Sequence, residues 1–168
     1  EGAEKLIAAA KKHNVPIIAD PKLTGLHRTQ GVDWVLFQSK GLELMRRRLG
    51  AATGAEAASI LLETNDWNHL LILEGQDGVT IHSRNTETVH VQCMLEEIRQ
   101  MIGLIDAAAV AVATAITLGL SVEETAHIAN AASECILVAD RTDRFVLRLD
   151  DMIDRIGEIA WSLQVSKR

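Results

Sequence analysis

Asp20 and a pair of glycines follow two apolar runs that could be strands. They could therefore lie at the edge of a sheet and bind a ligand there. Asp20 comes directly after the run 17–19, and Gly75 and Gly78 lie in the turn after the run 69–73. Open α/β sheets bind ligands outside the carboxyl ends of their strands, so Asp20 is a candidate binding residue. The two glycines suit a ligand contact, but any tight turn between strands needs them as well, and both interpretations stay open.

The histidines and cysteines do not have the spacing of a metal or redox site. The six histidines include no HxxxH or HExxH pair, and Cys93 and Cys135 form no CxxC motif. His82 and His90 could meet across a hairpin, but a third ligand is missing. We therefore expect no metal bound by these residues and two buried, reduced thiols, as is usual in a cytoplasmic protein.

The composition is that of an ordinary globular protein. Apolar residues make up 48% and charged residues 24% of the chain, and the formal net charge is −6. Only residues 46–48 form a basic run, so we expect neither nucleic acid nor a membrane as partner. The 20 residues from Met101 to Leu120 contain one charge, but their Ala and Thr content favours a fully buried core helix over a membrane span. The polar start predicts no signal peptide and a cytoplasmic location.

The hydrophobic pattern predicts alternating strands and helices. Helices are predicted at 4–13, 39–49, 55–63, 94–118, 121–139 and 149–163, and strands at 17–19, 34–37, 69–73, 79–83 and 88–91. Ser39 is expected to cap its helix, and Ser121 with Glu124 forms a capping box. Residues 94–101 contain no Gly or Pro and have high helix propensity, so that helix is predicted to begin at about Met94.

This order of elements predicts an α/β fold, specifically a partial doubly wound and mostly parallel sheet with a β-hairpin and C-terminal helices. Three core strands and a hairpin make a thin sheet, whereas parallel sheets are covered and usually wider. We therefore expect an upstream segment or a partner subunit to complete the sheet, and a homo-oligomer.

Four sequence blocks, taken together, resemble a known family. They are VPIIADPK at 15–22, LILEGQDGV at 71–79, IGLIDAAA at 102–109, and GLSVEE with ANAA within 119–132. In this order and spacing they resemble PfkB/ribokinase-type carbohydrate kinases, and most closely the heptose-phosphate kinase domain of ADP-heptose synthase. The resemblance implies that residues 1–168 are the C-terminal, nucleotide-binding half of a ribokinase-like domain, without the N-terminal sugar-binding half.

The resemblance also implies roles for individual residues. Asp106 would be the general base for a sugar hydroxyl, and Gly103 would begin the glycine motif whose backbone N–H groups hold the developing phosphate charge. ATP with Mg²⁺ would be the cofactor, and a sugar phosphate the substrate. The remaining residues implied to lie near the nucleotide or its phosphates are Gly75, Gly78, Asn130, Lys22 and Asp20.

Several positions depart from the family pattern. Ile105 stands for the second glycine, Ile102 for a threonine, Gln100 for an acidic residue, Leu73 for a threonine near the phosphates, and Ser39 and Leu42 for the Asn and Glu of the metal–water segment. A helix that began near Met94 would also occupy the N–H groups that an anion needs. Glu96 and Glu97 would then bring like charge toward a triphosphate.

Three functions follow from these observations. The first is an ATP-dependent sugar kinase that transfers a phosphoryl group to a sugar hydroxyl, with weakened activity. The alternative is a non-catalytic kinase-like domain with a structural or regulatory role. A third is an unrelated α/β module that binds a nucleotide or metabolite, because a fold alone does not fix a function.

Overall fold

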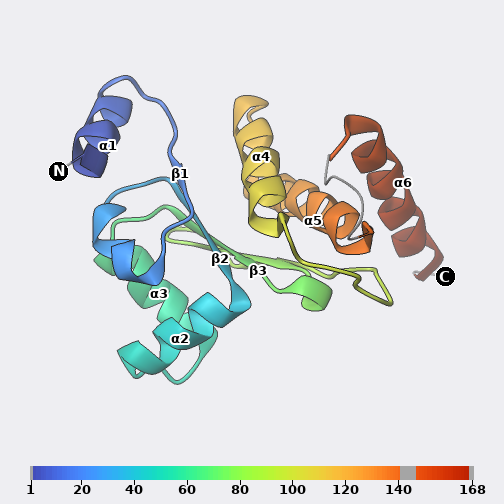
Figure 1. Ribbon diagram of the computed structural model, residues 1–168, viewed down its shortest axis with the longest axis horizontal. Coiled ribbons are helices and arrows are strands. Elements are labelled where there is room, and N and C mark those ends of the chain that lie inside the picture. Colours follow the sequence, from blue (N-terminus) through green and yellow to red (C-terminus); the bar gives the residue numbers. More distant parts are fainter. Residues whose placement is uncertain (1, 141–146, 167–168) are drawn as a thin grey trace. The chain divides into compact units, whose positions relative to one another are not determined.

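The computed structural model describes residues 2–140 and 147–166, with side chains described up to residue 160 (Figure 1). The chain divides into two compact units. Unit 1 comprises residues 1–73 and 80–89, and unit 2 comprises residues 74–79 and 90–168.

The elements alternate largely as predicted. The helices are α1 (Gly2–Lys12), α2 (Ser39–Leu49), α3 (Gly54–Thr64), α4 (Leu104–Thr117), α5 (Val122–Val138) and α6 (Leu149–Ser166), with short 3-10 helices η1 (Leu23–Arg28) and η2 (Gly75–Asp77). The strands are β1 (Ile18–Ala19), β2 (Trp34–Gln38), β3 (His69–Leu73), β4 (Val79–Ser83) and β5 (Val89–Val91), which pair in chain order. The first three are parallel, so the α/β class with a mostly parallel sheet is confirmed.

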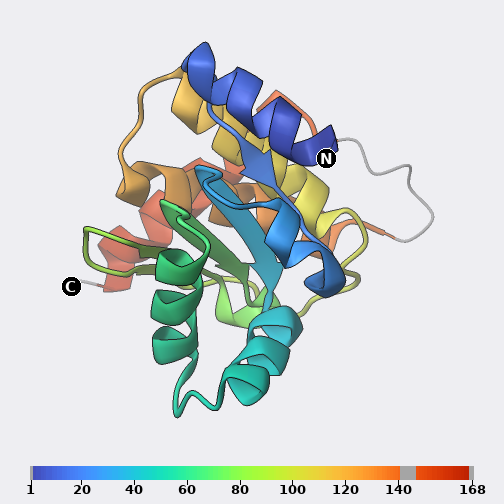
Figure 2. The ribbon, with the colours of Figure 1, turned by 90° about the vertical axis from the view of Figure 1, so that its left-hand side faces the viewer.

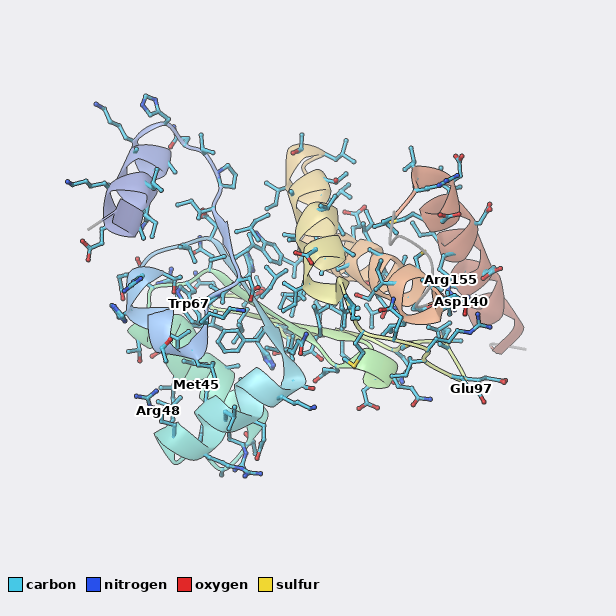
Figure 3. The ribbon with its side chains drawn as sticks, viewed as in Figure 1. Met45, Arg48, Trp67, Glu97, Asp140 and Arg155 are labelled. Atoms are coloured by element: carbon cyan, nitrogen blue, oxygen red, sulfur yellow. The ribbon has the colours of Figure 1, made fainter. Side chains whose placement is uncertain are left out.

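In unit 1, α2 and α3 pack against β2 and β3 (Figure 2). The parallel register places Trp34 opposite Ile18 on one side and opposite His69 on the other. The core between helices and strands includes Met45 and Trp67, both labelled in Figure 3. Trp67 is fully buried, and its indole N–H donates to the Thr29 carbonyl at 2.8 Å. A buried Trp needs such an acceptor, because an unpaired indole N–H inside a core costs free energy.

A polar network in unit 1 fixes the starts of the parallel strands. One oxygen of Asp33 accepts from the backbone N–H of Ile17 at 2.8 Å, and the other accepts from Asn68 at 3.1 Å. Arg84 donates to Asn68 at 2.8 Å and pairs with Asp66. These bonds link the residues that precede β1, β2 and β3, so they help to hold the parallel register.

Unit 2 is built on helices with small residues at their contacts. Helix α4 packs along α5, and α5 packs against α6. Four alanines line the buried face of α4, and they allow the two helix backbones to approach closely: Ala107, Ala108, Ala111 and Ala115. The opposite face is open, because Val110 and Leu118 are 61% and 66% exposed. The prediction of a fully buried helix is therefore wrong: α4 buries one face only.

None of the helices within the described ranges combines the length and the hydropathy needed to cross a bilayer. The stretch from Met101 to Leu120 is interrupted, since α4 occupies only 14 of its residues.

The segment 92–103 is not helical, whereas a helix was predicted from Met94 onward. Tertiary hydrogen bonds hold it in an extended path instead. The N–H of Met94 donates to the buried Glu134 carboxylate at 2.7 Å, and the N–H of Arg99 donates to the Leu137 carbonyl at 2.8 Å. Such partners outweigh a helix propensity of a few tenths of a kcal/mol per residue. The expected helix start at Met94 is therefore wrong, and α4 begins ten residues later, at Leu104.

Of the two helix caps predicted from the sequence, the one at Ser121 is confirmed and the one at Ser39 is wrong. Ser121 and Glu124 form the predicted capping box, in which the Ser121 N–H donates to Glu124 at 2.8 Å and the Glu124 N–H donates to the Ser121 hydroxyl at 3.2 Å. These bonds hold the pKa of Glu124 below its ordinary value. Ser39, in contrast, is the first residue of α2, and Gln38 is the N-cap, without a capping side-chain bond.

Candidate functional site

Gly103 ends the extended segment and starts α4. Its φ is +82° and its ψ is 3°, a left-handed backbone conformation that residues other than glycine rarely adopt. A Cβ at this position would meet nothing within 4 Å, so the dihedral angle, and not crowding, requires glycine here. The Gly103 carbonyl then accepts the first α-helical bond, from Ala107 at 2.9 Å.

This start leaves backbone donors at the head of α4. Among the described residues, the N–H groups of Gly103, Ile105 and Asp106 have no backbone acceptor, whereas the Leu104 N–H makes a long turn contact of 3.4 Å with the Met101 carbonyl. Free N–H groups and the positive end of the helix dipole together attract an anion. The arrangement can therefore bind a phosphate group.

Asp106 lies in the first turn of α4 and is exposed. It is three residues beyond Gly103, so the same helix end carries both a carboxylate and free N–H donors. A carboxylate accessible at this place can accept a proton from a hydroxyl group that approaches the bound anion.

The glycine turn after β3 needs both of its glycines. Gly75 is buried with a φ of +63°, and Gly78 has a φ of +100°. A Cβ on Gly78 would lie 2.0 Å from the Val91 carbonyl oxygen and 2.7 Å from the Cys93 backbone nitrogen. Gly78 is thus required by close backbone packing, whatever the turn binds.

Within unit 2, this turn runs beside the segment that leads to α4. The Gln76 side chain donates to the Glu96 carbonyl at 2.9 Å, and a Cβ on Gly75 would lie 3.6 Å from the Met101 side chain. Unit 2 therefore brings Gly75 and Gly78 to the same segment that ends at Gly103. Their contact with nucleotide phosphates stays a prediction.

Glu96 and Glu97 lie on this extended segment and not on α4. Both side chains are exposed, and Figure 3 shows Glu97 pointing outward. The prediction that they stand on the first turns of the phosphate-binding helix is therefore wrong, because the helix begins after them.

Asn130 is buried in α5 and bonded to the same segment. Its amide nitrogen donates to the Gln92 carbonyl at 3.3 Å and to Glu134 at 3.0 Å. Its carbonyl oxygen has no partner among the described atoms. These bonds make Asn130 an anchor of the segment, and its place near an adenine stays a prediction.

Asp20 and Lys22 belong to unit 1, just after β1, and both are exposed. Lys22 is the extended residue that precedes η1. Their predicted roles near the nucleotide stay predictions.

The predicted metal–water segment does not fit a magnesium ion. Leu42 is buried with 8% of its surface exposed, and an apolar side chain provides no oxygen for Mg²⁺. Ser39 is exposed and provides one hydroxyl, without a carboxylate at the Glu position. We assign no step to Mg²⁺ through these two residues.

Sequence reasoning missed two parts of this region. Glu134 is 0% exposed and pairs with Arg155 of α6, which is labelled in Figure 3. Gln100 is 5% exposed, and its side chain bonds both to the Ile136 carbonyl and to the Ile102 N–H. Glu134 carried a usable signal: an acidic residue flanked by buried apolar positions of a helix has to find a partner.

The comparison with known proteins decides the family. Residues 1–143 match the family described as pfkB family carbohydrate kinase. The chain belongs to this family. The resemblance inferred from the four sequence blocks is thereby confirmed.

Curated proteins named HldE match most of this chain. The bifunctional protein HldE of Haemophilus influenzae is 27% identical over 135 residues, which is 80% of this chain and 28% of that protein. HldE of Pelobacter propionicus is 27% identical over 133 residues, which is 74% of this chain and 26% of that protein. The chain thus spans just over a quarter of these curated relatives.

Two solved structures show the same fold at low identity. Phosphofructokinase-2 from Escherichia coli, in complex with substrates and products, is 17% identical, with a TM-score of 0.74 over 94% of this chain and 53% of that one. Ribokinase from Thermotoga maritima is 20% identical, with a TM-score of 0.73 over 92% of this chain and 53% of that one. The ribokinase-like fold is therefore confirmed.

Proposed function

We propose that this chain is the nucleotide-binding half of an ATP-dependent sugar kinase. The observation that carries the proposal is the start of α4, where left-handed Gly103 leaves the N–H groups of Gly103, Ile105 and Asp106 without backbone acceptors among the described residues. Membership of a carbohydrate kinase family supports ATP as the phosphoryl donor and a sugar as the acceptor. The matches to bifunctional HldE proteins support a heptose phosphate as the sugar.

In the proposed reaction, the donors at the head of α4 stabilise the charge of the γ-phosphoryl group as it transfers. Asp106 accepts the proton of the sugar hydroxyl, whose oxygen forms the new bond to phosphorus. The bond between the γ-phosphorus and the bridging oxygen breaks, and ADP leaves with that oxygen. The protonated Asp106 then releases its proton to water.

A second candidate is a non-catalytic kinase-like domain. Two observations favour it: half-buried Ile105 stands in the glycine motif of the anion site, and buried Leu42 stands where the family has a metal-associated Glu. A β-branched side chain limits how closely a phosphate can approach the backbone. Such a domain could keep nucleotide binding and lose transfer.

Thermal unfolding of the full-length protein with Mg-ATP separates the candidates from an unrelated function. A site filled at 100 times its dissociation constant stabilises the protein by about 2.7 kcal/mol, so we expect a clear rise in Tm. No shift at millimolar Mg-ATP would contradict nucleotide binding, and with it the kinase.

Substitution of the base then separates the kinase from the non-catalytic domain. We expect Asp106→Asn to abolish sugar-dependent ATP turnover and to keep the Tm shift, because the N–H donors remain. Asp150→Asn, at an exposed position on α6, is the matched control and should leave both unchanged. If the wild type turns over ATP and Asp106→Asn does not reduce this turnover, the role of Asp106 is overturned. If the wild type shows no turnover, the result favours the non-catalytic domain.

A further inference from the structure

We propose that Gln100 is the residue that positions the phosphate-binding turn, through hydrogen bonds to both sides of it. The inference rests on the proposed nucleotide site and adds the part of the chain that holds this site in shape. Gln100 does not contact the ligand in this account. It acts through the backbone of the residues that follow it.

The side chain of Gln100 is buried and makes two bonds. It is 5% exposed, and its amide nitrogen donates to the Ile136 carbonyl of α5. Its amide oxygen accepts the N–H of Ile102 at 2.7 Å. Only a side chain with a donor and an acceptor at one end can make both bonds, which a carboxamide does.

The two Gln100 bonds form a bridge between the Ile102 N–H and α5, and the bridge is attached to the last turn of α5. Two carbonyls of this turn bind the segment before α4, and that of Ile136 also accepts from the Ala139 N–H at 3.2 Å. The Ile136 carbonyl accepts from Gln100, and the Leu137 carbonyl accepts from the Arg99 N–H at 2.8 Å. Arg99 also pairs with Asp140 at 3.3 Å, on the surface. The backbone before Gly103 is thereby fixed to the neighbouring helix.

The bridge decides which N–H groups face a ligand. Gln100 occupies the Ile102 N–H, so the donors left for an anion are those of Gly103, Ile105 and Asp106. Gly103 has open space around its Cβ position, so no side-chain packing there keeps it left-handed. Buried Gln100 bonds to this turn and therefore constrains it from the side of the preceding residues.

The carboxamide can be tested separately from the shape of the side chain. A carboxylate at this position could still accept from Ile102, but it could not donate to the Ile136 carbonyl. Gln100→Glu therefore removes one of the two bonds, whereas Gln100→Met removes both bonds at nearly constant volume.

The test uses Gln100→Met, Gln100→Glu and the control Gln92→Met in the full-length protein. Gln92 is exposed on the same segment, and its side chain makes no bond among the described residues. Amide hydrogen exchange at Ile102 measures the bridge, and calorimetric titration with Mg-ATP measures the site. For Gln100→Met we expect exchange at Ile102 about tenfold faster and Mg-ATP binding about tenfold weaker.

Gln92→Met should change neither quantity. Gln100→Glu should keep Ile102 protected and weaken Mg-ATP binding less than Gln100→Met, because only the bond to the Ile136 carbonyl is lost. This variant tests the proposal if the Met variant fails to fold. Mg-ATP binding by the wild type that both Gln100 variants leave unchanged would overturn the positioning role alone. A wild type that binds no Mg-ATP would overturn the proposed function and the positioning role together.

Discussion

At Gly78 the chain comes closer to a neighbouring segment than any side chain allows. A Cβ there would lie 2.0 Å from the Val91 carbonyl oxygen, and the residue also has a φ of +100°. Gly119 is the natural comparison, because its φ of +69° is also positive but its surroundings are open. The two glycines thus separate the effect of crowding from the effect of conformation.

We expect Gly78→Ala to lower the free energy of unfolding by about 3 kcal/mol, since it adds a backbone clash to the conformational strain. Gly119→Ala should cost about 1 kcal/mol, from the conformation alone. Urea denaturation measures both. Equal losses for the two variants would contradict the close packing of the turn against Val91.

His69 links burial to the pH dependence of stability. Burial lowers its pKa, partly opposed by the negative charge of Asp33, and the ring stacks on Trp34 at 4.2 Å between centroids. Its contribution to stability is therefore complete above pH 6.5, the ordinary histidine value, and is lost as the pH falls through the lower pKa of the folded state. We expect His69→Asn to flatten the fall in unfolding free energy between pH 7.5 and 5. The exposed His127→Asn is the control, and an unchanged slope in the His69 variant would contradict the prediction.

The two thiols are protected from reaction by their surroundings. Burial, followed by the charge of Asp151, raises the pKa of Cys135 to about 11, and burial also raises the pKa of Cys93. The thiolate is the reactive form, so at pH 8 we expect iodoacetamide to modify folded Cys135 about 100-fold more slowly than an unhindered thiol. Unfolding in urea should remove the difference. Of the two thiols predicted to be buried, Cys93 is buried and Cys135 is only half-buried, so the prediction is wrong for Cys135. Fast modification of the folded protein would contradict the raised pKa of Cys135.

At the scale of elements, the sequence predicted well wherever local pattern and tertiary structure agree. The strand 69–73 and the helix 39–49 have the predicted bounds, because a short apolar run and a continuous amphipathic stretch each allow one interpretation. The segment 92–103 was mispredicted, because its bonds to α5 come from residues 30 to 40 positions away and leave no local pattern. The start of the phosphate site at Gly103 follows from the same bonds, so the resemblance could suggest its residues but not its helix boundary.

An ion pair between Glu134 and Arg155 links α5 to α6. Glu134 is 0% exposed and also accepts from Met94 and Asn130, so removal of Arg155 leaves a buried charge without its counter-ion. We expect Arg155→Met to lower the free energy of unfolding by about 3–5 kcal/mol. Arg148→Met, at an exposed position, should cost less than about 0.5 kcal/mol.

Combining Arg155→Met with Glu134→Gln tests the origin of this loss. The double variant should recover part of the stability, because the uncompensated charge is gone. If the loss of unfolding free energy in the double variant equals the sum of the losses in the two single variants, the two residues do not interact.

At the scale of the whole chain, family membership and fold are established, and the reaction is the proposal. The chain matches the pfkB carbohydrate kinase family over residues 1–143 and covers about half of the solved ribokinase-like structures it resembles. What it contributes in this account is the nucleotide end of the site, with its donors at the head of α4 and Asp106 beside them. The residues that would bind the sugar are expected in the other half of a complete kinase.

Hydrogen exchange with mass spectrometry on the full-length protein, with and without Mg-ATP, tests the central claim most directly. Bound phosphate should slow exchange in the peptide that covers residues 101–107, because it accepts hydrogen bonds from Gly103, Ile105 and Asp106. A peptide from α2 serves as the internal reference and should not change. If Mg-ATP leaves the exchange of residues 101–107 unchanged, whether or not it slows exchange in other peptides, the result would contradict a phosphate site at the start of α4.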